Sequence, residues 1–222
     1  MTKNIVTNRG RSTLKKTIQV LQNIVSRKGS SKILTFSMPH VLKALQLLFE
    51  EKFVSRAMFG REIHLGEGAV KTLISHLREA EIIESNRSGS YLTNKGQKFT
   101  NKILKSIPRE CKVGRCNLIP YKNNHAIIIK DYAFAIKSGL EQRDYAILYG
   151  SEGCITILFK DGKFIFPNND QDCFQKDKKI REYLLEKLCP ENNDVIIISS
   201  SNDSFIAEIS AKNSALWTMA TN

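Results

Sequence analysis

The stretch "LGEGAVKTLISHLREAEII", residues 65–83, predicts a helix that leads directly into a strand. At 100° per residue, four aliphatic side chains share one helical face and are expected in the core: Val70, Leu73, Ile74 and Leu77. The opposite face carries small or polar residues, mainly Gly68, Thr72, Ser75 and Glu79. His76 flanks this outer face, and we expect it at the surface. The segment therefore predicts a helix that is buried on one side and bare on the other.

The patterns around this helix complete a recognisable order. Pro39 suits the first turn of a preceding helix, and Ser55 is a predicted N-cap for "RAMFGREI". "HLGEG" breaks the helical pattern, and "IIESNRSGSYLTNKG" predicts a β-hairpin that turns at residues 86–89. A further helix is expected around residues 95–106. Helix, helix, turn, helix and hairpin within residues 38–107 predict a winged helix-turn-helix domain.

In such a domain the start of the third helix enters the major groove of DNA. The predicted base contacts are therefore Gly68, Lys71, Thr72 and Ser75. None of these residues is an Arg, Asn or Gln, the types that discriminate best between bases. The predicted phosphate contacts are basic residues on the neighbouring elements: Arg56, Arg87, Lys95 and Lys98.

The net charge of +12 is concentrated in the first half of the chain. Residues 1–37 contain eight Lys and Arg and no acid, residues 38–107 carry a net +4, and residues 108–222 are neutral. This asymmetry predicts an N-terminal half that binds a polyanion. Within the basic arm, residues 1–37, the spacing of Leu14, Ile18, Leu21 and Val25 predicts an amphipathic helix. We expect this helix to pack on the next domain, with a short dimeric coiled coil as the alternative.

The pattern changes after a predicted linker at residues 108–122. Strands are expected at "HAIIIK", "CITILFK", "KFIFP" and "DVIIISSS", with helices between them and at the C-terminus. The resulting β-α-β-β-α-β order with a terminal helix predicts a ferredoxin-like domain at residues 123–222. A mixed-sheet domain of another topology is the alternative. The whole chain is therefore expected to combine helices and sheets in an α+β or α/β fold.

Three charged residues cluster at the start of one C-terminal helix: Glu141, Arg143 and Asp144. A structural role is the first interpretation, because acids stabilise a helix N-terminus. The alternative is an effector site in which Arg143 binds an anionic group. The chain contains no dinucleotide-binding glycine motif, no phosphate-binding loop and no nucleophile–base spacing. We therefore expect neither an enzyme nor a bound cofactor.

Five cysteines are scattered through the chain, and reduced thiols are expected. Cys111 and Cys116 lack two further ligands at close spacing, so no metal site is predicted. No apolar run reaches the length of a membrane span and no secretory signal begins the sequence. A cytoplasmic location without membrane contact is the expectation.

Residues 53–96, from "FVSRAMFG" to "YLTNKG", resemble bacterial and archaeal winged helix-turn-helix regulators. Residues 139–167, "GLEQRDYAILYGSEGCITILFKDGKFIFP", resemble the C-terminal domain of an uncharacterised archaeal family that carries such a winged helix. The resemblance covers residues 38–222. It implies a transcription regulator but specifies no ligand or target. By analogy with other regulators of this two-part plan, we expect the winged helix to bind double-stranded DNA and the C-terminal domain to form a homodimer or bind a small-molecule effector. The alternative is a module that uses the winged helix to dock on protein or RNA.

Overall fold

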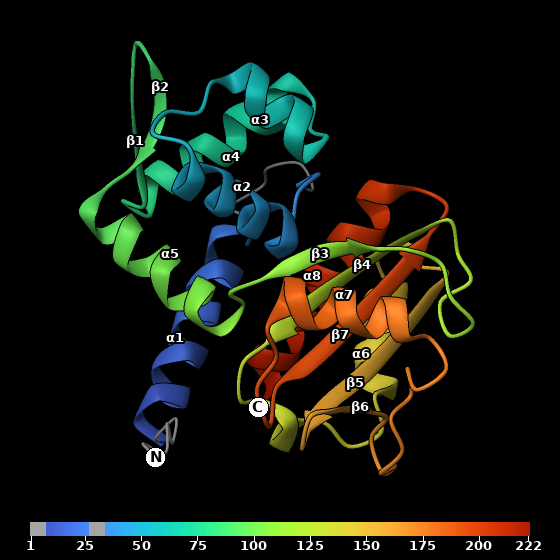
Figure 1. Cartoon of the computed structure of the whole chain (residues 1–222). Helices are drawn as coiled ribbons and strands as arrows, with labels where there is room; N and C mark the ends of the chain where they lie inside the picture. The colour runs from blue at the N-terminus through green and yellow to red at the C-terminus, as the bar shows by residue number, and fades with distance from the viewer. Residues whose placement is uncertain (1–7, 27–33) are drawn as a thin grey trace. The chain divides into compact units, whose positions relative to one another are not determined.

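The computed structural model describes residues 8–26 and 34–222 of the chain. Residues Gly10–Leu104 form one compact unit and Lys105–Asn222 form another (Figure 1). The two units contain helices and two separate sheets, so the fold is mixed α+β. Of the expected basic arm, residues 1–7 and 27–33 lie outside the described residues.

The N-terminal unit follows the predicted element order. Its elements are α1 (Asn8–Ile24), α2 (Met38–Glu50), α3 (Arg56–Ile63), α4 (Glu67–Glu79), β1 (Ile83–Asn86), β2 (Gly89–Leu92) and most of α5 (Asn94–Ser106). The inner side of α1 is buried at Leu14, Ile18 and Leu21. Val25, also predicted in this seam, is only half-buried, whereas Ile24 beside it is buried.

Two glycines allow close contact of backbone segments in this unit. Gly89 has φ +135°, and a Cβ at this position would lie 2.7 Å from the carbonyl oxygen of Val54. Val54 exchanges two backbone hydrogen bonds of 2.9 Å with Ser90, which ties the hairpin to the segment before α3. A Cβ on Gly96 would lie 1.9 Å from the carbonyl oxygen of Ile82, so α5 packs against the start of β1 only when this residue has no side chain.

The C-terminal unit contains the predicted β-α-β-β-α-β order and terminal helix. The elements are β4 (Asn123–Ile129), a short 3-10 turn η1 (Ala133–Ala135), α6 (Leu140–Ile147), β5 (Gly153–Lys160), β6 (Lys163–Ile165), α7 (Lys178–Leu188), β7 (Val195–Ser201) and α8 (Ser204–Thr221). An additional strand, β3 (Glu110–Val113), lies within the segment that was expected to be a linker. It pairs antiparallel with β4.

The ferredoxin-like prediction is wrong in strand order. The sheet is fully antiparallel with the order β3-β4-β7-β5-β6, so the fourth strand of the motif is central and the third lies at an edge. The ferredoxin-like arrangement instead places the first and third strands in the centre. Burial explains the difference. All seven residues of β7 are buried, whereas β6 is only three residues long and suits an edge.

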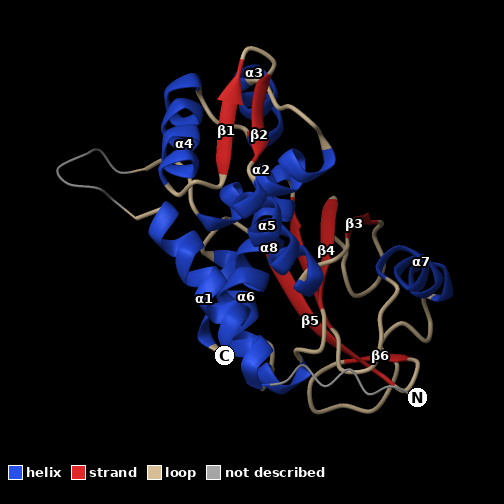
Figure 2. Cartoon of the chain, turned by 90° about the vertical axis from the view of Figure 1, so that its left-hand side faces the viewer, coloured by secondary structure: helices blue, strands red, loops and turns tan. Residues whose placement is uncertain are grey.

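Helices cover both faces of this sheet (Figure 2). Helices α6 and α8 pack together on one face, and α7 lies on the other. The α7 face encloses an apolar core that includes Phe159, Phe164 and Phe174. Alternate residues of β4 and β7 point to this core, which gives a three-layer α/β/α unit.

Charged groups are buried beside α8. The ammonium group of Lys212, whose side chain is fully buried, donates hydrogen bonds to the carboxylate of Glu110 on β3. Glu208 lies 3.3 Å from the same ammonium group, and His125 Nε2 lies 3.3 Å from Glu110 Oε2. Burial alone would raise the pKa of Glu110, but the charge of Lys212 and the neighbouring His125 hold this pKa well below its usual range. The network therefore fixes β3 to α8 through compensated charges.

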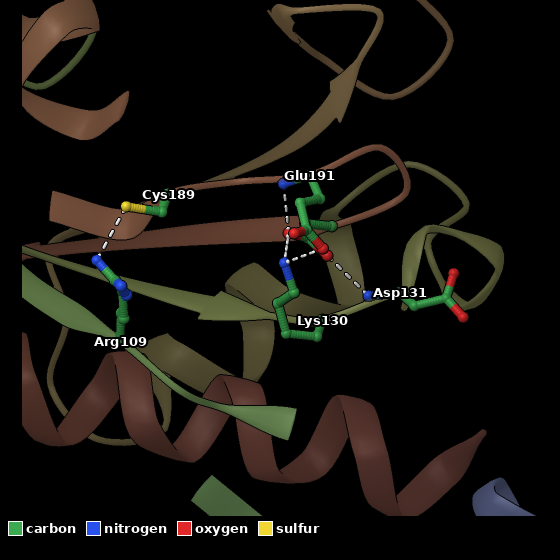
Figure 3. Close-up of polar contacts among 6 residues, drawn as sticks. Arg109, Lys130, Asp131, Cys189 and Glu191 are labelled. Carbon is green, nitrogen blue, oxygen red and sulfur yellow. Dashed lines mark hydrogen bonds and ion pairs between the residues drawn. The ribbon is translucent and has the colours of Figure 1, made fainter. Parts of the chain in front are cut away.

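A second buried carboxylate fixes the ends of β4 and β7 (Figure 3). Asp194 accepts hydrogen bonds from the backbone N–H groups of Asp131 and Glu191, at 2.9 and 2.7 Å. Lys130 donates to Asp194 at 2.7 Å and to Glu191 at 2.9 Å. Nearby, Arg109 donates to the sulfur of Cys189 at 2.9 Å. Asp194 is thus a structural anchor whose carboxylate is paired with Lys130 and two backbone N–H groups.

Substitution of two glycines in the N-terminal unit by alanine should have opposite effects on the free energy of unfolding. Gly96→Ala should lower the free energy of unfolding by at least about 2 kcal/mol, because the new methyl group collides with the backbone of Ile82. Gly68→Ala meets no atom within 4 Å and should raise it by up to about 1 kcal/mol through helix propensity. Urea unfolding of both full-length variants measures the difference. Equal stabilities would contradict the close contact.

Candidate nucleic-acid interface

Local signals determine where α3 ends and α4 begins. The Ser55 hydroxyl accepts a hydrogen bond from the backbone N–H of Met58 at 3.1 Å and caps α3, as predicted. Helix α3 ends at His64, which adopts the left-handed conformation with φ 56°, and Gly66 then caps α4. Phe59 on α3 and Leu77 on α4 are buried. This turn directs the outer face of α4 to the surface.

The residues on the inner face of α4 are those that the sequence predicts to be buried. Val70, Leu73, Ile74 and Leu77 are all buried. On the outer side, Gly68, Lys71 and Ser75 are exposed and Thr72 is half-buried. The first turns of α4 therefore present small residues beside the longer exposed side chains of Glu67 and Lys71.

The two hydroxyl groups on this surface already use their protons. Thr72 donates to the carbonyl oxygen of Gly68 at 3.0 Å, and Ser75 donates to the carboxylate of Glu79 at 3.1 Å. Each oxygen retains lone pairs and can still accept a hydrogen bond. In the major groove, such an acceptor suits the amino groups of adenine and cytosine.

The hairpin carries Arg87 at its tip. Strands β1 and β2 pair from Ile83–Leu92 to Asn86–Gly89, and the side chain of Asn86 accepts from the backbone N–H of Ser88 at 2.8 Å. Arg87 is exposed at this turn. Figure 1 shows the hairpin extending away from the helices of its own unit. The arginine is thus positioned to contact a neighbouring molecule.

The predicted phosphate contacts differ in their partners. Arg56, at the first position of α3, and Lys98, on α5, are exposed. Among the described residues, Arg56, Lys71, Arg87 and Lys98 form no salt bridge. Lys95 differs, because its ammonium group lies 2.6 Å from the carboxylate of Glu81. This hydrogen bond and the lysine charge lower the pKa of Glu81. Arg56, Lys71, Arg87 and Lys98 are therefore available to bind phosphate, whereas Lys95 is paired with Glu81.

The far end of α4 is acidic. A groove of about 460 Å³ between α4 and β1 is lined by Ser75, Arg78, Glu79, Glu81, Ile83, Glu84 and Thr93. Its three carboxylates would repel a phosphate backbone. A polyanion that contacts the start of α4 is thus directed away from its last turn. Glu81 itself has φ 59°, in the left-handed region where glycine is the favoured residue.

The prediction that His76 lies at the surface is wrong. Its side chain is 8% exposed, and its ring Nδ1 lies 2.6 Å from the carbonyl oxygen of Ile24 at the end of α1. Since a carbonyl can only accept, Nδ1 carries the proton. The ring also contacts Phe36 edge-to-face, with centroids 5.8 Å apart. His76 therefore joins α4 to α1, a contact between residues far apart in the sequence.

An aromatic groove on the same unit was not predicted. It has a volume of about 890 Å³ and lies beside the hairpin and the C-terminal end of α2. Phe49 is 45% exposed, and Phe53 packs edge-to-face on Tyr91 at 5.6 Å. Glu50, Glu51, Asn86 and Gln97 also line it. Phe49 continues the apolar spacing of α2, so the sequence alone predicts a core position for it, and only the tertiary fold reveals the groove.

The predicted effector residues lie on the surface of α6. Glu141, Arg143 and Asp144 are exposed, and Arg143 Nη2 lies 3.7 Å from Asp144 Oδ1. The pairing is the structural one expected at this helix start. Ser199 and Ser200, at the end of the predicted strand "DVIIISSS", lie buried within β7. The side chain of Ser199 donates to that of Ser151 at 2.9 Å.

The cysteines remain as thiols. Burial raises the pKa of Cys111 to about 11 and that of Cys173 to about 12. Across residues 8–26 and 34–222, no three metal-ligating side chains gather at one place. No helix among the same residues has both the length and the apolar character needed to cross a membrane.

Comparison with known proteins relates this chain to proteins of unknown function. Residues 120–219 match the family described as "Domain of unknown function (DUF4443)". The fold is similar to that of "Hypothetical protein PH0730 from Pyrococcus horikoshii OT3", with a TM-score of 0.66 and 26% sequence identity. This similarity covers 81% of the present chain and 91% of the archaeal protein. No curated protein matches the sequence.

His76→Ala should lower the free energy of unfolding by about 2–3 kcal/mol, because it leaves a cavity and an unpaired carbonyl group at Ile24. Ser75→Ala, on the neighbouring exposed position, should change it by less than about 0.5 kcal/mol. Denaturant unfolding of the two variants measures both values. A His76→Ala protein as stable as Ser75→Ala would refute the buried contact.

Proposed function

We propose that residues 38–107 form a winged helix-turn-helix and that the protein is a DNA-binding transcription regulator. In this proposal, α4 enters the major groove and Arg87 on the hairpin contacts the backbone beside it. The C-terminal unit serves dimerisation or effector sensing. The similarity to the archaeal hypothetical protein concerns the fold and does not indicate an activity.

The observation that carries the proposal is the distribution of charge around α4. Lys71 lies on its outer face, Arg56 starts the preceding helix and Arg87 occupies the hairpin tip, all exposed and without salt bridges among the described residues. Three acids gather at the far end of α4, and its first turn carries one, Glu67. This arrangement gives a polyanion one favourable path, across the start of the helix and the hairpin tip.

The hydrogen bonds that the Thr72 and Ser75 hydroxyls already donate predict limited discrimination between DNA sequences. Thr72 and Ser75 offer acceptors but no free protons, and Lys71 can contact either guanine or phosphate. Backbone contacts therefore supply most of the affinity, and base contacts add a semi-specific preference. The protein would combine strong salt dependence with modest selectivity among duplexes.

A second function is favoured by the aromatic groove. Its exposed Phe49 and the adjacent Tyr91 offer apolar and stacking surface to a protein segment or an RNA base, and Glu50 and Glu51 disfavour a duplex backbone there. In this case the winged helix is a docking module. The two functions use different surfaces of the unit and can be separated by substitution.

The proposal predicts steep salt dependence of duplex binding. Four available cations, each releasing about 0.9 counterion, give a slope of log K against log salt of about −3.6 or steeper. Lys71→Ala combined with Arg87→Ala should reduce its magnitude by about 2, because two phosphate or groove contacts are lost. Fluorescence anisotropy with labelled duplex DNA between about 50 and about 200 mM salt measures the slope.

Lys176→Ala combined with Lys179→Ala is the matched control, since it removes two exposed charges from the C-terminal unit. This variant should bind duplex DNA as the unchanged protein does. Salt-independent binding, or equal effects of the two double substitutions, would refute the DNA-binding proposal. Tighter binding of structured RNA that Phe49→Ala abolishes would instead support the docking module.

A further inference from the structure

The outer face of α6 is apolar at both ends. Leu140 is 56% exposed, Ile147 is 48% exposed and Leu148, at the C-cap, is 76% exposed. At 100° per residue, Leu140, Asp144 and Ile147 fall within one narrow stripe, flanked by Arg143 on one side and Leu148 on the other. Such a concentration of exposed aliphatic side chains on one short helix indicates a surface that another molecule covers.

The inner side of α6 is held in place by polar contacts with α8. Gln142 donates to the hydroxyl of Thr218 at 3.2 Å, and the hydroxyl of Ser214 donates to the carbonyl oxygen of Gln142 at 2.8 Å. Asn213 donates to the carbonyl oxygen of Tyr145 at 2.7 Å. These directional bonds leave α6 one orientation on the sheet. Its leucines and isoleucine cannot rotate inward to escape water.

The stripe is self-complementary about a two-fold axis. If two copies of α6 pack antiparallel with the axis midway between residues 143 and 144, Leu140 of each copy faces Ile147 of the other. Leu148 then closes over the first turn of the opposite helix. The centre contains one Arg143 and one Asp144 from each copy, so its charges sum to zero. Each guanidinium group, now 3.7 Å from its own Asp144, gains a second carboxylate partner.

We propose that the outer face of α6 is the contact between two copies of this chain. The residues first considered for an anionic effector, Arg143 and Asp144, then form the charged centre of that interface. This inference rests on the geometry of α6 alone and holds whether or not the N-terminal unit binds DNA. It assigns dimerisation, not effector sensing, to this surface of the C-terminal unit.

The size of the face predicts a weak dimer. An eight-residue helix is about 12 Å long, and two such helices cover much less than the roughly 1,200–2,000 Å² of a stable interface. Self-association in the micromolar range is therefore expected. Binding of two half-sites on one duplex would strengthen such a dimer through linkage.

Sedimentation equilibrium of the full chain across a concentration series tests the proposal, with a thiol reductant present because Cys189 is exposed. The unchanged protein should be a reversible dimer. Ile147→Glu combined with Leu148→Glu should raise the dissociation constant at least about tenfold, because it places charge at both ends of the apolar contact. Lys176→Glu combined with Lys179→Glu is the matched control, because both lysines are exposed in the C-terminal unit outside α6, and it should leave the constant unchanged.

Exchanging the charges at positions 143 and 144 distinguishes this interface from any other. Arg143→Asp gives a centre with four carboxylates and Asp144→Arg gives one with four guanidinium groups, so each variant alone should be monomeric. An equimolar mixture should recover dimers, since the opposite charges then face each other. A monomeric unchanged protein, a dimer that the double glutamate variant retains, or a mixture that stays monomeric would each overturn the proposal.

Discussion

The N-terminal unit depends on the complete burial of one side of α4. Four aliphatic side chains and His76 face inward, and the Nδ1–H of this histidine binds the carbonyl oxygen of Ile24. Because the inner side is committed to the core, contact with another molecule falls to the outer side, which includes Gly68, Lys71, Thr72 and Ser75. The same constraint sets the direction of the hairpin, since β1 begins four residues after α4 ends.

Charge and chemistry on the two units point to separate tasks. The available cations lie around the start of α4 and the hairpin tip, whereas residues 108–222 carry no net charge. In the C-terminal unit the buried charges are compensated: Lys212 binds Glu110, and Asp194 binds Lys130 and two backbone N–H groups. These networks stabilise the sheet and its helices. The surface of this unit that stands out is the apolar stripe of α6.

Periodicity was sufficient to predict the elements but not their partners. The 3.6-residue spacing of Val70, Leu73 and Leu77 predicted the buried face of α4, and the apolar runs "CITILFK" and "KFIFP" predicted the strands β5 and β6. The central position of β7 depends on which strand can be buried on both faces. A local sequence pattern does not show how the strands compare in this respect. His76 was misplaced for the same reason, because its partner lies 52 residues away. Strand β3 was missed because its alternation of polar and apolar residues spans only four positions between Pro108 and Gly114.

Among the candidate contacts, sequence position identified the exposed cations but not their pairing. Lys95 resembles Lys98 in sequence, yet it lies 2.6 Å from Glu81, a residue separated from it by the hairpin. Amide hydrogen exchange of the full chain with and without duplex DNA tests the central claim most directly. Duplex DNA should protect amides at the start of α4 and at residues 86–89, and none at residues 79–84. Protection confined to the C-terminal unit, or absent from α4, would contradict it.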